Sequence, residues 1–500
     1  MPALRFLRVS LCSLMMASLG IAAAIGQDTS GSISGSVTDE QGQVLPGATV
    51  TALNERTGAT RSLVTDDKGN FHFTAMPPAT YTVRVEMANF RTFERKRNVL
   101  SPSDRVSLGT IKLTVGLGES IVVEASGTRV NTEETQHAGL ITANQIEQIQ
   151  TKGRDVTTLM RLSPGVRYED TVDSLGESFG TLVPHVSGQR RTWNHITVDG
   201  VLGNEIGQTD RMAQQINLDA VGEIKILLNT YRAEYGRTGG AQIQIVSKGG
   251  DAQYRGNAYY YGRNEHLNAN NFFNNRSNRA RPRYRFNTVG FNLGGPVPGL
   301  NKDEKKLFFF YSIEAPLTER PGPLRQWMVP TALERQGDFS QTLDSAGRLI
   351  VVRDPLTGQP FPGNRIPSSR INQNGLALLN LMPLPNSTDR SFTRGQFNYE
   401  RQEIAENPKV NNILRLDWRP SQKDSLYLTV KDWWSDQKGS EVTAGPNKWG
   451  WFNTHYLNTD RTYSVSHTHV FSSNRSTRRR SGPGGRASPS IPSPPRTCSA

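Results

Sequence analysis

The chain has 500 residues, which is enough for two to four domains. Hydrophobic residues make up 35% of it and the mean hydropathy is −0.53, which excludes a bundle of transmembrane helices. The formal charge of +13 is uneven, because residues 475–500 carry six arginines and no acidic residue. The rest of the chain is only mildly basic, so the charge is weak support for a nucleic-acid partner.

Residues 1–26 have the pattern of a secretory signal peptide. Arg5 and Arg8 precede the apolar run LCSLMMASLGIAAA, and small residues come directly before the expected cleavage point. The run is short for a membrane span, which needs about 20 residues, although an N-terminal membrane anchor is the alternative. The chain is therefore expected to be exported, away from nucleic acid. Of the two cysteines, Cys12 and Cys498, the first lies in the signal, so no internal disulfide is expected.

Residues 27–115 have the alternation of a small β-sandwich. Tyr81, Val83 and Val85 fall on one face of a predicted strand, and several short strands separated by turns are typical of an immunoglobulin-like sandwich. The motif GSVTDEQGQVLPGATVTAL, followed by TDDKGNFHFTAMPPATYTVRVEMANF, resembles the carboxypeptidase regulatory-like domain, which has a transthyretin-like fold. The resemblance implies no peptidase chemistry. It makes carbohydrate binding a hypothesis, which the fold alone does not establish.

Residues 119–250 change to a mixed pattern. Thr142 is expected to cap a helix, with Gln145 completing a capping box. An apolar stripe over residues 156–160 indicates a second helix. The strand-like segments HITVDGV, EIKILLNT and GAQIQIVSKGG follow, so a small α+β domain is predicted.

Four motifs in this domain carry a second resemblance. GESIVVEASGTRV, ITANQIEQIQTKGRDVTTLMRLSPGV, SGQRRTWNHITVDGV and VGEIKILLNTYRAEYGRTGGAQIQIVSKGG occur in the order seen in the plug of TonB-dependent outer-membrane receptors. With the sandwich in front of it, the whole resembles the Oar-like branch of that family. The resemblance implies a gated pore that is energised by a TonB-type protein of the inner membrane.

Residues 251–474 alternate as the strands of a transmembrane β-barrel do. In RLDW and SLYLTVK, apolar residues share one face, polar residues share the other, and the short turn PSQKD joins the two segments. The segment RYRFNTVGFNL breaks the pattern and predicts a bulge or a different strand boundary. The chain is thus predicted to be mainly β, with a sandwich, an α+β plug and an incomplete antiparallel barrel. A water-soluble exported β-protein would explain the alternation but not the plug motifs.

The resemblance also indicates the segment that contacts the TonB-type partner. That segment is usually a short extended stretch before the plug, and it can pair edge to edge with a partner strand. An ordinary linker strand is the alternative. The TonB-box-like residues are Glu119, Ser120, Ile121, Val122, Val123, Glu124 and Ala125.

Within the plug, a second set of family-typical residues is expected to be structural rather than to bind substrate. Glycine supplies unusual backbone angles in tight turns, and Arg237 is expected to pair with a carboxylate between plug and barrel. The set comprises Asp199, Gly200, Glu234, Tyr235, Gly236 and Arg237.

No catalytic motif is found, so the chain is not expected to be an enzyme. His467 and His469 fall on one strand face, but a lone pair lacks further metal ligands, and a lumen or interface position is favoured. Neither a metal nor a cofactor is expected. The expected partners are a TonB-type protein, outer-membrane lipid and an unidentified substrate, for which an oligosaccharide and a peptide are candidates.

The strand-like pattern ends near Asn474, and residues 475–500 are rich in Arg, Pro and Ser. The family barrel has about 22 strands, and residues 251–474 suffice for a third to a half of them. The first hypothesis is that the tail is read out of frame and the barrel is truncated; the alternative is a disordered basic tail. A truncated product would act only as an exported binding or adhesion module through its sandwich.

Overall fold

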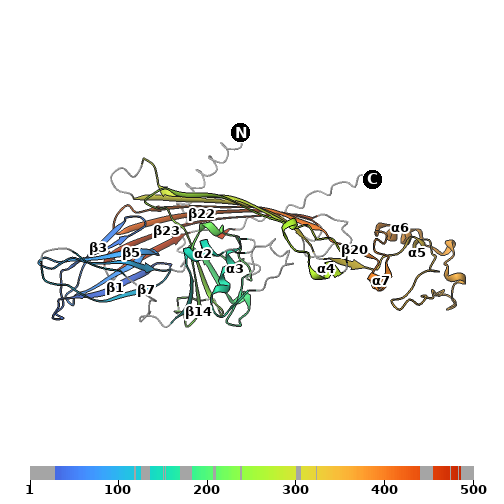
Figure 1. The fold of residues 1–500 in the computed structure, drawn as a ribbon, viewed down its shortest axis with the longest axis horizontal. Coiled ribbons are helices and arrows are strands. Elements are labelled where there is room, and N and C mark those ends of the chain that lie inside the picture. The colour runs from blue at the N-terminus through green and yellow to red at the C-terminus, as the bar shows by residue number, and fades with distance from the viewer. Residues whose placement is uncertain are drawn as a thin grey trace.

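A computed structural model describes residues 29–116, 120–124, 136–149, 151, 154–168, 183–205, 210–232, 234–236, 239–276, 278–299, 306–322, 324–439, 454–472, 475–481 and 484–485. The fold is mainly β, as predicted. A sandwich lies at one end of a long curved sheet, and the plug lies beneath the middle of that sheet (Figure 1). The predicted signal peptide, Glu119, Ala125 and Arg237 lie outside the described residues.

The sandwich consists of two sheets, with strand orders β4-β1-β7 and β3-β2-β5-β6-β8. The predicted alternation of Tyr81, Val83 and Val85 is confirmed, because all three side chains are buried in its core. The strands are β1 (Gly31–Thr38), β2 (Thr49–Asn54), β3 (Thr60–Val64), β4 (Asn70–Met76), β5 (Ala79–Glu86), β6 (Phe93–Leu100), β7 (Arg105–Lys112) and β8 (Ile121–Glu124).

The plug is built on a five-stranded sheet with the order β13-β12-β15-β14-β9. Its elements are β9 (His137–Ile141), α2 (Ala143–Gln148), α3 (Val156–Leu159), η2 (Met160–Leu162), β10 (Val166–Arg167), β11 (His185–Val186), η4 (Arg191–Trp193), β12 (His195–Val198), β13 (Val201–Leu202), η5 (Leu218–Ala220), β14 (Val221–Asn229) and β15 (Gln242–Ser247). The predicted capping box of Thr142 and Gln145 is present at α2.

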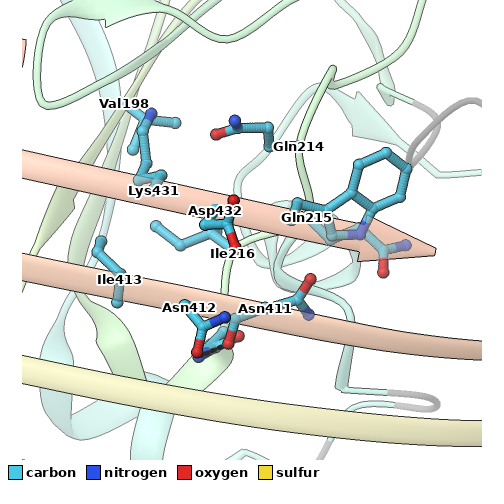
Figure 2. Close-up of a pocket in the computed structure, with 11 residues that line it drawn as sticks. Val198, Gln214, Gln215, Ile216, Asn411, Asn412, Ile413, Lys431 and Asp432 are labelled. Atoms are coloured by element: carbon cyan, nitrogen blue, oxygen red, sulfur yellow. Dashed lines mark hydrogen bonds between the residues drawn. The ribbon is translucent and has the colours of Figure 1, made fainter. Parts of the chain in front are cut away.

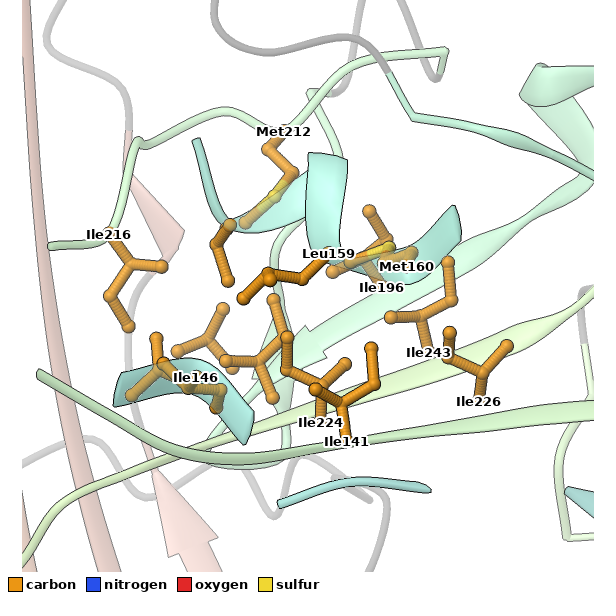
Figure 3. Packing of buried hydrophobic residues seen from close by; sticks show 14 of the residues in the cluster. Ile141, Ile146, Leu159, Met160, Ile196, Met212, Ile216, Ile224, Ile226 and Ile243 are labelled. Carbon is orange, nitrogen blue, oxygen red and sulfur yellow. The ribbon is translucent and has the colours of Figure 1, made fainter. Parts of the chain in front are cut away.

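The plug core forms where its two short helices cover this sheet. Ile224, Ile226 and Ile243 from the sheet meet Leu159 and Met160 from the helical turns, and all five are buried (Figure 3). Phe310 and Ile413, which belong to the barrel strands described next, are part of the same cluster. The plug therefore packs its apolar core directly against the barrel wall.

The barrel sheet runs in the order β16-β17-β18-β21-β22-β23-β24, so β16 and β24 are the ends of the described sheet. Every neighbouring pair is antiparallel. The strands are β16 (Arg255–Asn264), β17 (Arg285–Pro296), β18 (Leu307–Pro321), β21 (Ile404–Trp418), β22 (Asp424–Gly439), β23 (Thr454–Ser472) and β24 (Arg475–Ser481), with β25 (Gly484–Gly485) also paired to β23.

Two long connections lie at the end of the sheet opposite the sandwich (Figure 1). The first contains η6 (Glu265–Leu267) and α4 (Phe272–Arg276). The second contains β19 (Arg325–Trp327), α5 (Ala332–Arg335), η7 (Pro362–Asn364), η8 (Ser368–Arg370), α6 (Gln373–Leu381), α7 (Arg390–Thr393) and β20 (Tyr399–Arg401). No helix in the described part of the chain is long and apolar enough to cross a membrane.

The structure decides one local alternative and differs from one local expectation. Of the two alternatives for RYRFNTVGFNL, the bulge is absent, because β17 pairs without a break on both sides, and the different strand boundary is found, because β17 begins only at Arg285. Residues 475–481, which the sequence assigned to the basic tail, form β24 and pair with β23. Pairing on a sheet edge needs only backbone groups, so a strand can form there without apolar alternation. The reading frame of the tail stays a hypothesis.

Candidate functional site

The barrel sheet presents mainly polar side chains to the plug, apart from residues such as Phe310 and Ile413, and mainly apolar side chains to the opposite side. The buried polar residues that face the plug include Thr288, Ser312, Glu314, Thr318, Asn411, Thr429, Thr462 and Ser464. The exposed apolar residues that alternate with them include Val289, Phe291, Leu293, Leu317, Trp418, Tyr463 and Val465. Apolar side chains outside and polar ones inside are the pattern of a barrel wall in lipid.

Arg154 connects the plug to this wall. Its Nε donates to Glu314 Oε2 on β18 at 2.9 Å, and its guanidinium also pairs with Asp219 of the plug. The guanidinium lies over the rings of Tyr259 and Tyr261 on β16, with centroids at 4.7 and 4.3 Å. Burial lowers the pKa of Arg154, but the charges of Glu314 and Asp219 outweigh it and raise the pKa above its usual value. The arginine is therefore charged, and it is bound by carboxylates of both the plug and the barrel.

A second connection is centred on Arg415 of β21. Its Nη1 donates to the carbonyl oxygen of Ser247 at 2.9 Å, and its Nη2 lies 2.9 Å from Asp417 Oδ1. Asp199 Oδ1 of the plug is 3.6 Å from Arg415 Nη1. Tyr427 of β22 donates its hydroxyl to the carbonyl oxygen of Asp199 at 3.3 Å. Two barrel strands thus hold the same turn of the plug.

Asp199 and Gly200 form that turn, at positive φ angles of 51° and 76°. The Asp199 carboxylate accepts hydrogen bonds from the Ser247 amide at 2.9 Å and from its hydroxyl at 2.8 Å. The carboxylate therefore joins the turn to the end of β15. These contacts give Asp199 a position suited to the structural role expected for it.

Glu234 and Tyr235 lie elsewhere, close to Ser103 of the sandwich, and Gly236 follows them in the chain. Gln244 Nε2 donates to the Tyr235 hydroxyl at 3.3 Å. Arg232 pairs with Glu234 at 2.8 Å and donates to the carbonyl oxygen of Ser103 in the sandwich at 3.2 Å. The structure therefore separates the predicted plug residues into one group at the barrel and another at the sandwich.

The junction of sandwich and plug contains a buried lysine between acidic groups. Lys225 Nζ on β14 donates to Asp104 Oδ1 at 2.6 Å and to the carbonyl oxygen of Pro102 at 2.8 Å. Glu223 is half-buried two residues earlier on the same strand. Burial, followed by the negative charge of Asp104, raises the pKa of Glu223 to about 7.

A small polar cavity lies between the plug and strands β21 and β22. Its volume is about 10 Å³, which is room for about one water molecule. Gln214 and Gln215 of the plug lie near Lys431 and Asp432 of β22 in Figure 2. Gln214 Nε2 donates to Thr462 Oγ1 at 3.0 Å. The interface there is hydrogen-bonded rather than dry.

The remaining predicted positions lie on other surfaces. Ser120–Glu124 of the TonB-box-like segment lie along β6 of the sandwich, with β8 parallel to it. His467 and His469 lie on the outward face of β23. His467 Nε2 and His469 Nδ1 lie 2.9 and 2.8 Å from Asp424 Oδ1. No group of three metal-ligating side chains is found among the described residues. Because the buried, plug-facing positions of β23 alternate with His467 and His469, the two histidines face away from the plug rather than into the lumen.

Comparison with known proteins agrees with this architecture. Residues 246–483 match the family model described as an outer membrane beta barrel domain, and residues 32–114 match the carboxypeptidase regulatory-like domain. One curated relative is the TonB-dependent transporter Oar of Myxococcus xanthus, which is 25% identical over 239 residues. The chain is thus similar to TonB-dependent receptors, and nearly half of it matches an outer-membrane barrel domain. The barrel domain makes this receptor-like chain an outer-membrane protein, and the relative that it matches is a transporter.

The receptor chain spans only part of its relatives. The match to Oar covers 46% of this chain and 21% of Oar. The transporter YddB from Escherichia coli is 11% identical, with a TM-score of 0.40 over 67% of this chain and 37% of that one. A ferric enterobactin receptor from Pseudomonas aeruginosa is 16% identical, with a TM-score of 0.39 over 70% of this chain and 41% of that one.

Sequence reasoning missed the residues that join the receptor's units. Arg154 and Arg415 lie within segments quoted above, but no local pattern marked these two residues or Glu314 as contacts, because each acquires its partner across plug and barrel only when distant parts of the chain fold together. The one available signal was a charged residue in an otherwise apolar or aromatic context, such as Glu314 after KLFFFYSI. A charge on the lumen face of a barrel strand needs a partner, and the plug is the unit that supplies it.

Proposed function

We propose that the receptor transports a bulky substrate across the outer membrane and that its plug is released by a TonB-type partner. The observation that carries the proposal is Arg154, which joins the plug to β18 through Glu314. Besides the apolar contacts of Phe310 and Ile413, the interface is held by such charged contacts and by hydrogen bonds like that from Gln214 to Thr462, which water can replace when the plug moves. An apolar interface of the same size would have to expose its whole surface to water.

The direction of the receptor in the membrane follows from its connections. At the sandwich end the strands are joined by residues 297–306 and 419–423, whereas residues 265–284 and 322–403 form longer connections at the other end. Barrels of this class have short periplasmic turns and long extracellular loops. The sandwich is therefore assigned to the periplasm, where an inner-membrane partner can reach it.

The partner-contacting segment is assigned to Ser120–Glu124, which forms an extended strand on the sandwich. An extended strand can be recognised through its backbone by a partner strand. A linker strand without a partner is the alternative, and the substitutions described below separate the two. The substrate stays unidentified, with an oligosaccharide and a peptide as the candidates.

The sandwich is proposed to be a component of the receptor rather than an independent binding module. The ion pair of Lys225 with Asp104 and the hydrogen bond from Arg232 to Ser103 join it to the plug. A module that acted alone would not need these contacts. Sugar binding by the sandwich stays a hypothesis.

Opening can be tested by thiol labelling in living cells. In a chain carrying Cys498→Ser, Ser312→Cys places a single thiol beneath the plug, because Ser312 Oγ accepts a hydrogen bond from Asn217 Nδ2 at 3.1 Å and is fully buried. A water-soluble maleimide should label it in cells with an active TonB system and not in cells with an inactive one. Leu356→Cys, which lies on the exposed connection, should be labelled equally in both. Equal labelling of Ser312→Cys in the two strains would contradict the proposal.

A further inference from the structure

Strand β8 is docked on the sandwich as the last strand of its larger sheet. It pairs in parallel with β6, from Phe93 opposite Ile121 to Lys96 opposite Glu124. The Ile121 amide donates to the carbonyl oxygen of Thr92 at 2.9 Å. Arg97 Nη1 lies 3.1 Å from Glu124 Oε2. The segment is thus held straight by backbone pairing along one of its two edges.

The other edge of β8 has no neighbouring strand in the described part of the chain. Val122 and Val123 are 49% and 41% exposed, and as consecutive residues they point to opposite faces of the sheet. An edge strand with exposed apolar side chains is a template for another extended chain. A sugar or a lipid headgroup would not use such an edge, because the recognition groups are backbone amides and carbonyls.

We infer that the partner adds an extended strand to the open edge of β8 while β8 stays paired to β6, so that the sandwich and the partner share one continuous sheet. This inference rests on the proposed function, in which Ser120–Glu124 contact the TonB-type partner. It adds that the sandwich is part of the docking site. The opposite arrangement is exchange, in which the partner strand replaces β6.

Pairing with β6 favours addition over exchange for two reasons. A segment that is already extended loses less conformational freedom when a second strand binds it. Addition also breaks no existing hydrogen bond, whereas exchange must first remove the bond between Ile121 and Thr92. The sandwich therefore acts as a template that presents β8 to its partner.

A shared sheet would also change how a pull reaches the plug. The sandwich is joined to β14 through Lys225 and Asp104, and to β15 through Gln244 Nε2, which donates to Ser103 Oγ at 3.3 Å. Force applied to β8 would pass through β6 and this junction as well as along the chain to β9. In the exchange arrangement β8 would leave the sandwich, and only the second route would remain.

A disulfide between β6 and β8 tests the inference directly. Lys96 and Glu124 are paired across the two strands, and neighbouring strands are close enough for a disulfide. The receptor carrying Lys96→Cys and Glu124→Cys, with Cys498→Ser, is oxidised and titrated with the purified periplasmic domain of a TonB protein from the same bacterium. Addition predicts that the oxidised receptor binds within about twofold of the reduced one. Binding that falls at least tenfold on oxidation and returns on reduction would overturn the inference.

The matched control is a disulfide far from β8. Thr51 and Ser62 face each other on β2 and β3, with their hydroxyl oxygens 2.9 Å apart. Thr51→Cys with Ser62→Cys locks the opposite edge of the same sheet. This variant should bind the TonB domain equally in both redox states.

Two proline substitutions separate addition from exchange without a cross-link. Successive backbone amides of a strand point to opposite edges. Because the Ile121 amide points toward β6, the Val123 amide also points toward β6 and the Val122 amide points toward the open edge. Addition predicts at least a tenfold loss of binding for Val122→Pro and a smaller loss for Val123→Pro, whereas the reverse order would show exchange. If the unmodified receptor does not bind the TonB domain, the partner assignment in the proposed function is overturned together with the inference. If it binds and only the order is reversed, the proposed function stands and the inference fails.

Discussion

The guanidinium Nε of Arg154 in the plug lies 2.9 Å from the Glu314 carboxylate on barrel strand β18. The two side chains are only 11% and 5% exposed, so both charges have lost most of their water. A buried pair of this kind contributes little when intact, but the loss of one partner leaves an uncompensated charge. The contact is therefore suited to hold the plug in one position, and displacing either charged partner should destabilise the whole interaction.

Removal of the arginine should loosen the plug more than neutralisation of one carboxylate. Arg154→Ala leaves Glu314 and Asp219 buried without a cation, and it should cost about 3–5 kcal/mol of plug stability. Glu314→Gln should cost less, because Asp219 still pairs with Arg154. Hydrogen exchange of the amides in β14 would measure both free energies of opening. A larger effect for Glu314→Gln than for Arg154→Ala would contradict this account.

The junction of sandwich and plug should weaken as the pH rises. Glu223 has a pKa of about 7 in the folded receptor, against 4.5 for an unperturbed glutamate. Between these values the folded chain keeps a proton that the unfolded chain has lost, so stability decreases as the pH rises through this window. The effect is at most about 3 kcal/mol, and smaller because Glu223 is only half-buried.

The measurement is hydrogen exchange of the β14 amides at pH 5 and at pH 8, corrected for the intrinsic exchange rate. Glu223→Gln cannot ionise and should abolish most of the difference between the two pH values. Asp66→Asn serves as the control, because Asp66 lies in an exposed turn of the sandwich. A pH dependence that is unchanged in Glu223→Gln would show that another group is responsible.

The sequence revealed what depends on local periodicity and missed what depends on distant pairing. The inward position of Tyr81 and the capping box of Thr142 follow from two-residue and three-residue spacings, and both are confirmed. The contact of Arg154 with Glu314 joins residues that are 160 positions apart, and no local pattern encodes it. The docking of β8 was missed because parallel edge pairing uses backbone groups, which every residue except proline supplies.

Asp199 provides a test of the turn that the barrel holds. Asp199→Asn keeps an acceptor for the Ser247 amide and tolerates the positive φ angle, but it loses the charge that faces Arg415. It should cost about 1 kcal/mol, whereas Asp199→Ala loses both contacts and should cost about 2–3 kcal/mol. Thermal unfolding of the purified receptor at fixed detergent concentration would rank the two. Equal melting temperatures for Asp199→Ala and the unmodified receptor would exclude a structural role.

A charged side chain on the outward face of the barrel sheet should lower the stability of the receptor. Val289 lies in the middle of β17 and is 58% exposed on the side away from the plug, which is the lipid side in an outer-membrane receptor. Val289→Arg should cost about 2–4 kcal/mol of stability in the membrane, because no polar partner is available in lipid. Leu356→Arg is the matched control, since Leu356 is 81% exposed on the long connection. Urea titration of the receptor in lipid vesicles should show a lower midpoint for Val289→Arg and an unchanged one for Leu356→Arg. Equal midpoints would mean that Val289 faces water, and the assignment of this face to lipid would then be wrong.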